Sequence, residues 1–331
     1  MGRLKEAIES TGGFQVWIKT PTLATLPPVR PDSPIEALAT SEIYPSLLSA
    51  IQRQSEKDGL RFRLRETRGP DGWRTADLRL DRGSDRVCRW RVREVRHLLR
   101  AAIVIDDLGL DLQAARKLLA LPYPLTLSVL PHLRYSSETA EEAYRARREV
   151  MLHLPMEPEA AHPSPGKGEI HTGMSSEELR QILELDLASV PHAAGVNNHM
   201  GSRATTQAVL MTRVMKALAN HRLYFIDSRT TSGSVALDAA RRQGLPAFYR
   251  SVFLDDTETI PYTLGQLREF RRAVQQQSVA LAIGHPYPST LAALANFLPE
   301  LAKEDIQLVP ASQLVQLPEI ARLWPAHRST P

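Results

Sequence analysis

Carboxylates, imidazoles and amides recur directly after short apolar runs in this sequence. Ile105 is followed by Asp106 and Asp107, and Leu152 is followed by His153. Six runs share this arrangement, and the polar residues after them are Asp106–Asp107, His153, Asn197–Asn198–His199, Asp227–Ser228–Arg229, Asp255–Asp256 and His285. Histidine and carboxylate ligands without thiolates suit zinc, manganese, cobalt or nickel in a site that leaves positions open for water. A further carboxylate could accept a proton from that water, and a further histidine could protonate a leaving group. This combination hydrolyses amides or esters.

Each of these residues also has a purely structural explanation. Asp106 and Asp107 could open a turn, and Asp227 could cap a helix. His153 could be a hydrogen-bonded core histidine, and His285 could pack within a turn. The repeated placement after six separate runs nevertheless favours a shared site, because chance explains one such residue more easily than a series.

Other chemistries have no motif in the sequence. There is no Gly-x-Ser-x-Gly segment, and the single cysteine, Cys88, has no setting of a nucleophile, so a serine or cysteine hydrolase is disfavoured. Neither a Walker loop nor a Gly-x-Gly-x-x-Gly segment after a strand is present, which argues against nucleotide use. One cysteine also excludes an internal disulfide and a multi-cysteine zinc site.

The elements that must position these residues alternate between strand and helix from Ala101 onward. Short apolar runs stand at 102–105, 125–130, 150–152, 194–196, 223–226, 247–254, 279–283 and 306–309. Amphipathic helical segments separate most of them, among them 175–188, which opens with a possible capping box of Ser175 and Glu178. This alternation predicts an α/β fold with a parallel sheet, and seven or eight units favour a closed or nearly closed β/α barrel. An open doubly wound sheet is the alternative. In either fold the carboxyl ends of the strands share one rim, where the polar residues would meet.

The first hundred residues have a different pattern. Five prolines within 20–34 indicate an extended arm, and apolar residues at helical spacing predict a helix over 43–51. Two stretches around 60–65 and 88–93 then alternate apolar residues with arginines, which predicts a small α+β unit with an antiparallel sheet. We therefore expect an N-terminal arm or linker at 1–40, a small basic α+β domain at 41–98, a barrel at 99–318 and a tail at 319–331.

The basic character of the chain is local. The net charge is +4, but residues 57–100 hold 14 Lys or Arg against 7 Asp or Glu. An arginine-rich sheet face could bind an anionic polymer such as cell-wall material or nucleic acid. The alternative is a solvated face in which the arginines are interleaved with Asp77, Asp81 and Asp85. The absence of aromatic residues on that face favours the second interpretation and makes a nucleic-acid partner unlikely.

No apolar run approaches the length that spans a bilayer, and the first residues lack the apolar stretch of a signal peptide. The chain is therefore expected either to be cytoplasmic or to lack a leader that once preceded it. The sequence indicates nothing about the oligomeric state.

Seven segments give the region from about Ala101 to Leu317 a family resemblance. In order they are IDDLG, LPHLRYS, HLPMEP, NNHMGS, FIDSRT, VFLDD and IGHP. Together they resemble the divergent polysaccharide deacetylases, a branch of the polysaccharide deacetylase superfamily. The resemblance implies a distorted parallel β/α barrel with its site at the carboxyl ends of the strands, and it favours the bacterial envelope as the location.

The resemblance also implies roles for individual residues. Asp106 is similar to the catalytic base, Asp107 to the metal-binding aspartate, His153 to the first metal histidine and His285 to the general acid. Two departures from the ordinary motifs remain: Glu157 stands where members have a second metal histidine, and Asn197-Asn198-His199 replaces an arginine-containing motif. We expect His199 to be the third metal ligand, with Glu157 as the alternative, and Asn198, Asp227 and Arg229 to hold substrate.

The expected function follows from this resemblance. It is a hydrolase acting on amide C–N bonds, with a divalent metal, most readily zinc, that removes acetyl groups from an N-acetylated or O-acetylated glycan, with cell-wall polysaccharide as its partner. One alternative is a barrel that binds glycan without turnover. Another is a metal hydrolase that acts on a different acyl or amide substrate.

Overall fold

The computed structural model describes residues 6–8, 10–11, 15–19, 34–159 and 164–317, and it divides into two compact units, Met1–Leu99 and Arg100–Pro331. The proline-rich part of the expected arm, residues 20–33, and the expected tail at 319–331 lie outside the described residues. Each unit has a core of its own and is described by itself.

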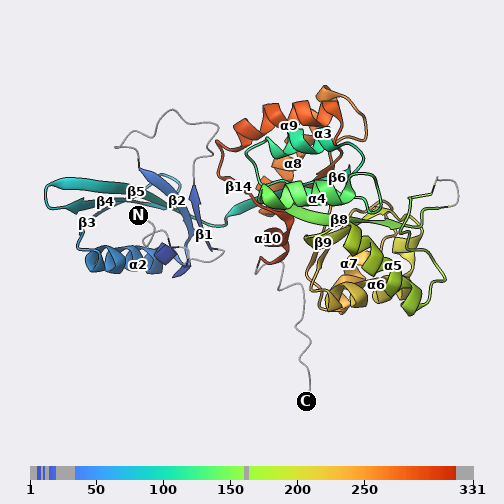
Figure 1. The fold of residues 1–331 in the computed structure, drawn as a ribbon. Coiled ribbons are helices and arrows are strands. Elements are labelled where there is room, and N and C mark those ends of the chain that lie inside the picture. The colour runs from blue at the N-terminus through green and yellow to red at the C-terminus, as the bar shows by residue number, and fades with distance from the viewer. Residues whose placement is uncertain (1–5, 9, 12–14, 20–33, 160–163, 318–331) are drawn as a thin grey trace, which may run out of the picture. The chain divides into compact units, whose positions relative to one another are not determined.

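The first unit is a five-stranded sheet with one long helix on it (Figure 1). Its elements are β1 (Val16–Lys19), β2 (Ile35–Thr40), α2 (Tyr44–Lys57), β3 (Arg61–Arg68), β4 (Arg74–Arg82) and β5 (Asp85–Val95). The strand order is β1-β2-β5-β4-β3. Tyr44, Leu47 and Ile51 of α2 pack against Leu78 and Trp90 of the sheet. This confirms the small α+β domain.

The boundary expected at residue 40 differs from the structure. Residues 35–40 are not part of an arm: as β2 they lie between β1 and β5, and β2 pairs with β5 in parallel, so the sheet is mixed rather than antiparallel. The physical reason is burial, because Ala37 and Ala39 complete the core under α2. In the sequence, the prolines up to Pro34 indicate an extended arm, and the short strand that follows them directly has no turn residue to separate it from that arm.

The arginines of β3, β4 and β5 lie mostly on the face opposite the core, and several pair with aspartates there. Arg79 lies 2.7 Å from Asp81, and Arg91 lies 3.0 Å from Asp77. These pairs support the interpretation of a solvated face on which aspartates offset part of the arginine charge.

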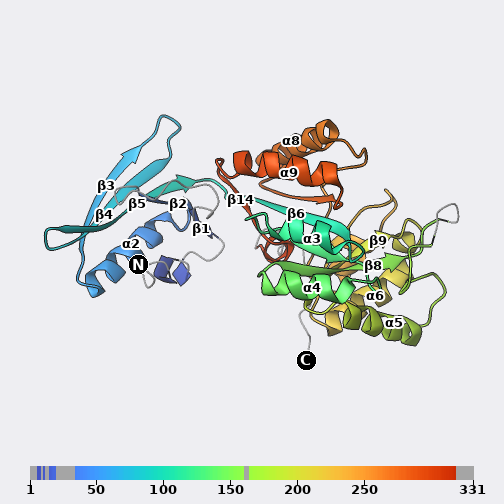
Figure 2. The ribbon, with the colours of Figure 1, turned by 45° about the horizontal axis from the view of Figure 1, so that its top comes forward.

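The second unit is an eight-stranded parallel sheet path wrapped by helices (Figures 1 and 2). The strands are β6 (Leu99–Leu108), β7 (Thr126–Val129), β8 (Glu149–Met156), β9 (Ala193–Met200), β10 (Tyr224–Asp227), β11 (Ala247–Tyr249), β12 (Val252–Phe253) and β13 (Val279–Gly284). Their order is β11-β10-β9-β8-β7-β6-β13-β12, and a ninth strand, β14 (Ile306–Leu308), pairs with β6. All eight apolar runs expected as strands are confirmed, as is the distorted parallel barrel.

The distortion of the barrel lies in the segment 247–253. β11 pairs with β10, and β12, two residues later, pairs with β13 at the other end of the path. The segment 247–253 thus supplies the strands at both ends of the sheet path, β11 and β12. Arg250 and Ser251 lie between these two strands. The single run expected at 247–254 accordingly forms two short strands.

Helices cover the outside of this sheet. They are α3 (Leu112–Leu119), α4 (Ser136–Arg145), α5 (Ser176–Ser189), α6 (Ala208–Asn220), α7 (Ala236–Arg242), α8 (Ile260–Gln277) and α9 (Pro288–Leu301). Figure 2 shows α8 and α9 side by side. Helix α8 also contacts β13, α5 contacts β8, and α6 contacts β10. The capping box of Ser175 and Glu178 at the start of α5 is confirmed. Within the described residues, no helix is both long and apolar enough to cross a bilayer.

The barrel interior separates an apolar base from a polar rim. Ala102, Val104, Met151 and Ile226 fill the interior together with Leu314 of α10 (Ala311–Val315). The α10 segment binds near the amino ends of the strands, where the backbone N–H of Ala311 donates to the hydroxyl at the start of β7. The carboxyl ends are left to the polar residues that follow each strand.

Candidate metal centre

Two consecutive carboxylates reach the rim because β6 contains a bulge. The register with β7 shifts between Ile105 and Leu108, so β6 holds one extra residue there. Neighbours in a regular strand point to opposite faces, but Asp107 has a positive φ of 55°, which re-aims its side chain. Asp106 is buried and Asp107 is partly exposed, and both carboxylates lie near His153. The bulge therefore supplies two carboxylates from adjacent positions of one strand.

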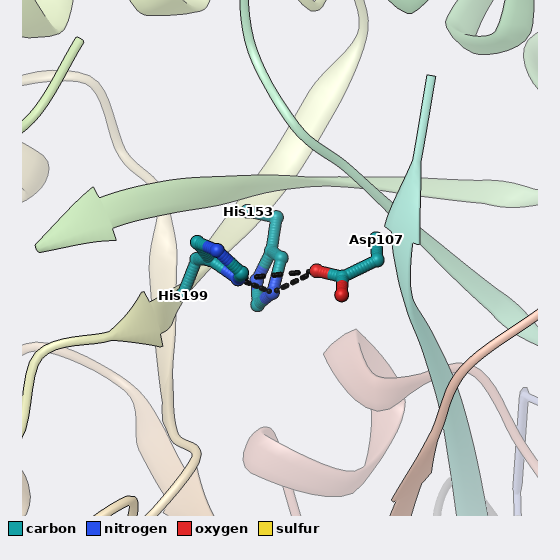
Figure 3. A group of neighbouring side chains, drawn as sticks. All are labelled: Asp107, His153 and His199. Carbon is teal, nitrogen blue, oxygen red and sulfur yellow. Dashed lines mark hydrogen bonds and ion pairs between the residues drawn. The ribbon is translucent and has the colours of Figure 1, made fainter. Parts of the chain in front are cut away.

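His153 on β8 and His199 on β9 face the same side of adjacent strands. His153 pairs with Asn197 across the two strands, and His199 lies two residues further along β9. Figure 3 shows both imidazoles directed at the carboxylate of Asp107. Oδ1 of Asp107 lies 3.2 Å from Nε2 of His153 and 3.1 Å from Nδ1 of His199, and these two nitrogens are 3.1 Å apart. Three donor atoms thus surround one point.

These three side chains fit a divalent cation. Donor atoms about 2.0–2.1 Å from one ion, at angles between octahedral and tetrahedral, would be about 2.9–3.4 Å from each other, and the three measured separations lie in this range. Oδ1 of Asp107 is buried, and among the described residues it has no hydrogen-bond partner of acceptable geometry. Asp107, His153 and His199 are also the group of potential ligands that the described residues bring together.

Asp107 and His153 shift each other's pKa. Burial raises the pKa of Asp107, but the imidazoles of His153 and His199 outweigh it and hold that pKa well below its usual range. Burial lowers the pKa of His153, but the carboxylates of Asp106 and Asp107 outweigh it and raise that pKa. A cation that binds at Nε2 of His153 must compete with a proton for that nitrogen.

Asn197 contacts both Asp106 and His153, and sequence reasoning placed it after a strand at the rim but gave it no role. Its Nδ2 donates to Oδ1 of Asp106 at 2.8 Å, and its Oδ1 lies 2.9 Å from Nδ1 of His153 and accepts from Ser128 Oγ at 2.7 Å. The amide orientation follows from the partners, because a carboxylate can only accept. Nδ1 of His153 therefore carries the proton, and its Nε2 is free to bind a metal. Strand alternation from His199 could have identified Asn197.

His285 lies across the rim from the histidine pair, at the end of β13. Its Nε2 is 3.8 Å from Oδ2 of Asp107, and its Nδ1 is 2.9 Å from Oδ1 of Asp255. Oδ2 of Asp255 accepts from the backbone N–H of His285 and from Thr290 Oγ1. Burial lowers the pKa of His285, but the bond to Asp255 and the nearby carboxylates raise it to about 9. Sequence reasoning placed Asp255 after a strand at the rim but gave it no role.

The residues expected to hold substrate lie around β10. The side-chain amide of Asn198 donates to the carbonyl of Met200 at the end of β9 and accepts from the backbone N–H of Ser228, so it joins β9 to the loop after β10. Asp227 accepts from the backbone N–H of Arg229 and from Ser234 Oγ. Arg229 is exposed, and its guanidinium lies 3.7 Å from the ring centre of Tyr249.

Glu157, the alternative third ligand, has other partners. Oε2 accepts from the backbone N–H and the hydroxyl of Thr172, and Oε1 lies 3.1 Å from Nη1 of Arg203. These contacts hold Glu157 against the segments that follow β8 and β9. His199, not Glu157, completes the group with Asp107 and His153.

Comparisons with known proteins agree on the second unit. The family model described as divergent polysaccharide deacetylase matches residues 103–315. The YibQ protein of Escherichia coli K12 is 36% identical over 230 residues, which cover 70% of this chain and 72% of that protein. A protein of Haemophilus influenzae is 37% identical over 213 residues, which cover 64% of this chain and 75% of the relative. A crystal structure of an Agrobacterium tumefaciens protein is similar in fold, with a TM-score of 0.63 at 24% identity, over 66% of this chain and 89% of that one.

Proposed function

The chain belongs to the divergent polysaccharide deacetylase family, and from this premise we propose that it is a metal-dependent hydrolase that removes acetyl groups from an N-acetylated or O-acetylated glycan. One observation carries the proposal. Asp107, His153 and His199 converge at ion-binding separations, with the Asp106 carboxylate on one side and the His285–Asp255 pair on another. An acid, a base and a metal-ligand set are the parts that metal-dependent amide hydrolysis uses.

Asp107, His153 and His199 would hold the cation, most readily zinc, with manganese, cobalt or nickel as further candidates for this donor set. When bound, the cation polarises the acetyl carbonyl and makes water more acidic. Asp106 is the group placed to take the proton from the attacking water. Its Oδ1 is held by Asn197, and Oδ2 lies 3.6 Å from Nε2 of His153, on the side of the ligands.

His285 is the group placed to protonate the leaving nitrogen. Asp255 holds its Nδ1–H, so Nε2 faces the rim, 3.8 Å from Asp107. The raised pKa of His285 keeps the ring protonated near neutral pH, as a general acid requires. The exposed guanidinium of Arg229 is available to glycan oxygens. Asn198 and Asp227 would act on substrate through the loop that carries Arg229.

Metal content of the purified full chain, measured without chelators, tests the proposal. We expect one zinc or similar ion per chain in the wild type and its loss in Asp107→Ala and His153→Ala. The controls are Asp238→Ala and His97→Ala, whose side chains are exposed and lie outside the group. A wild type that neither contains nor takes up zinc, manganese, cobalt or nickel would contradict the proposal.

Acetate release from N-acetylated oligosaccharides then separates deacetylation from binding alone. Acetate released by the metal-loaded wild type, and not by His285→Gln with its metal intact, is the expected result. Glycan binding without acetate release would instead favour a barrel that binds its ligand without turnover. Release from non-carbohydrate amides alone would assign a different acyl substrate.

A further inference from the structure

A pocket of about 400 Å³ opens beside the site, at the seam between β11 and β12. Arg250, Phe253, Asp256, Tyr262 and Gln266 line it. Its volume is in the range of small-ligand sites. None of these residues belongs to the metal, acid or base groups described above.

The pocket shares one wall with the proposed acid. The ring of Phe253 meets the imidazole of His285 edge to face, with centres 5.3 Å apart, and the guanidinium of Arg250 lies 4.8 Å from the centre of the Phe253 ring. In a deacetylase the leaving amine belongs to the sugar, so the sugar must lie on the His285 side of the metal ligands. A chain that continues from that sugar past Phe253 reaches Arg250.

Arg250 is held in place by hydrogen bonds to two backbone carbonyls. Its Nε donates to the carbonyl of Ser228 at 2.6 Å and its Nη2 to the carbonyl of Arg229 at 2.8 Å. Nη1 makes no hydrogen bond with the described residues, and none of their carboxylates lies within ion-pair distance of this guanidinium. Burial lowers the pKa of Arg250, and the more distant carboxylates of Asp227, Asp106 and Asp256 offset part of this effect. A half-buried guanidinium with a free N–H is a ready partner for a carboxylate.

The surroundings of the pocket also favour an anion. Tyr262 and Gln266 belong to the first two turns of α8, an 18-residue helix whose amino end carries positive partial charge. Asp256, which is exposed at the pocket, is the opposing charge among the lining residues. Its removal should therefore strengthen the binding of an anion.

We propose that this pocket binds the sugar next to the one that loses its acetyl group, and that Arg250 pairs with a carboxylate on that sugar. The inference rests on the proposed function and specifies its substrate class. The substrate is an acidic N-acetylated glycan rather than a neutral one.

Calorimetric titration of the full, zinc-loaded chain with two matched probes tests this inference, while acetate release is followed in parallel. One probe is a tetrasaccharide of alternating glucuronate and N-acetylglucosamine, and the other is the same tetrasaccharide with its carboxylates methyl-esterified. The wild type should bind the acid about tenfold more tightly than the ester. Arg250→Gln should reduce this ratio to about one.

Asp256→Asn keeps the inference testable if Arg250→Gln fails to fold, because Asp256 is exposed and makes no hydrogen bond among the described residues. This variant should raise the ratio of acid to ester affinity about twofold. Glu184→Gln, an exposed carboxylate on α5, is the matched control and should leave the ratio unchanged.

Equal affinity of the wild type for acid and ester, or a preference for the acid that survives in Arg250→Gln, would overturn the inference and leave deacetylation standing. A preference for the acid that depends on Arg250, without release of acetate from any N-acetylated glycan, would instead retain the pocket assignment and contradict the catalytic proposal. Failure of both probes to bind, with acetate released from a neutral chitin oligosaccharide, would also overturn the inference.

Discussion

At the scale of single residues, Asn197 links the metal ligands to the base. One amide orients Asp106 through Nδ2 and His153 through Oδ1. We expect Asn197→Ala to weaken zinc binding about 10- to 100-fold, because His153 loses the acceptor that fixes its Nδ1–H tautomer. Competition with a chromophoric chelator measures this affinity. Acetate release should also fall, since Asp106 loses its donor.

Ser128→Ala is the graded control for Asn197. It removes a single hydrogen bond to Oδ1 of Asn197 and leaves the two contacts to the site in place. Its loss of zinc affinity should be smaller than that of Asn197→Ala. Equal zinc affinity in wild type and Asn197→Ala would show that the tautomer of His153 is set by something else.

Asp255 should matter for proton transfer and not for metal content. Its bond to Nδ1 raises the pKa of His285 to about 9, so Asp255→Asn should lower that pKa. A general acid is active below its pKa, so the alkaline limb of the pH–rate profile should move to lower pH. The maximal rate should fall about 10²- to 10⁴-fold. Zinc content identical to that of the wild type, with an unshifted alkaline limb, would exclude His285 as the acid.

Strand alternation explains which residues could be predicted from sequence and which could not. The types and positions of Asp106, Asp107, His153 and His285 after apolar runs were enough to predict that they meet at one rim. Asn197 and His199 are two residues apart and share the inner face of β9, whereas Asn198 between them bonds the backbone outside it. The sequence showed three polar residues in a row, and only the register decides which of them face inward.

At the scale of elements, the bulge in β6 is a feature that the hydrophobic periodicity of the sequence does not predict. A regular strand would direct Asp106 and Asp107 to opposite faces, and the extra residue together with the positive φ of Asp107 removes that separation. The two short strands β11 and β12 have a similar origin. The run 247–254 reads as one strand, but its two halves pair with strands at opposite ends of the sheet path.

Helix α5 is anchored by a buried acid. Asp186 is fully buried, its Oδ1 lies 2.7 Å from Nε2 of His132, and burial raises its pKa to about 8. Between about pH 4 and 8 the folded chain therefore keeps a proton on Asp186 that the unfolded chain has already released. Stability contributed by this group is complete below that window and is lost as the pH rises through it. Urea unfolding of wild type and Asp186→Asn from pH 5 to 9 tests this.

Asp186→Asn should flatten the decline of the unfolding free energy over that range, because an amide does not titrate. Glu184→Gln, on the same helix but exposed, should leave the decline as it is. Parallel pH profiles for wild type and Asp186→Asn would mean that the proton on Asp186 is not linked to folding.

At the scale of the whole molecule, the site and the basic segment belong to different units. All of the proposed ligands and proton-transfer groups lie between Asp106 and His285, in the second unit, and the arginine-rich sheet lies in the first. Because Arg63 and Arg79 pair with Asp81 and Arg91 pairs with Asp77, the first unit has less free charge than its composition suggests. This local pairing is invisible in a count of charges along the chain.

Two separate cores predict two unfolding transitions. The core of the first unit contains Trp90, Leu78 and Leu47, and the barrel core contains Met151 and Ile226. Trp90→Ala should lower the stability of the first unit alone by about 3–5 kcal/mol, because a fully buried aromatic side chain leaves a large cavity. A ligand stabilises only the folded unit that binds it, so zinc should raise the midpoint of the other transition alone. Differential scanning calorimetry of wild type and Trp90→Ala, each with and without zinc, measures both effects. If Trp90→Ala lowered the zinc-sensitive transition by the same amount, the two units would unfold as one, and separate cores would not mean separate stability.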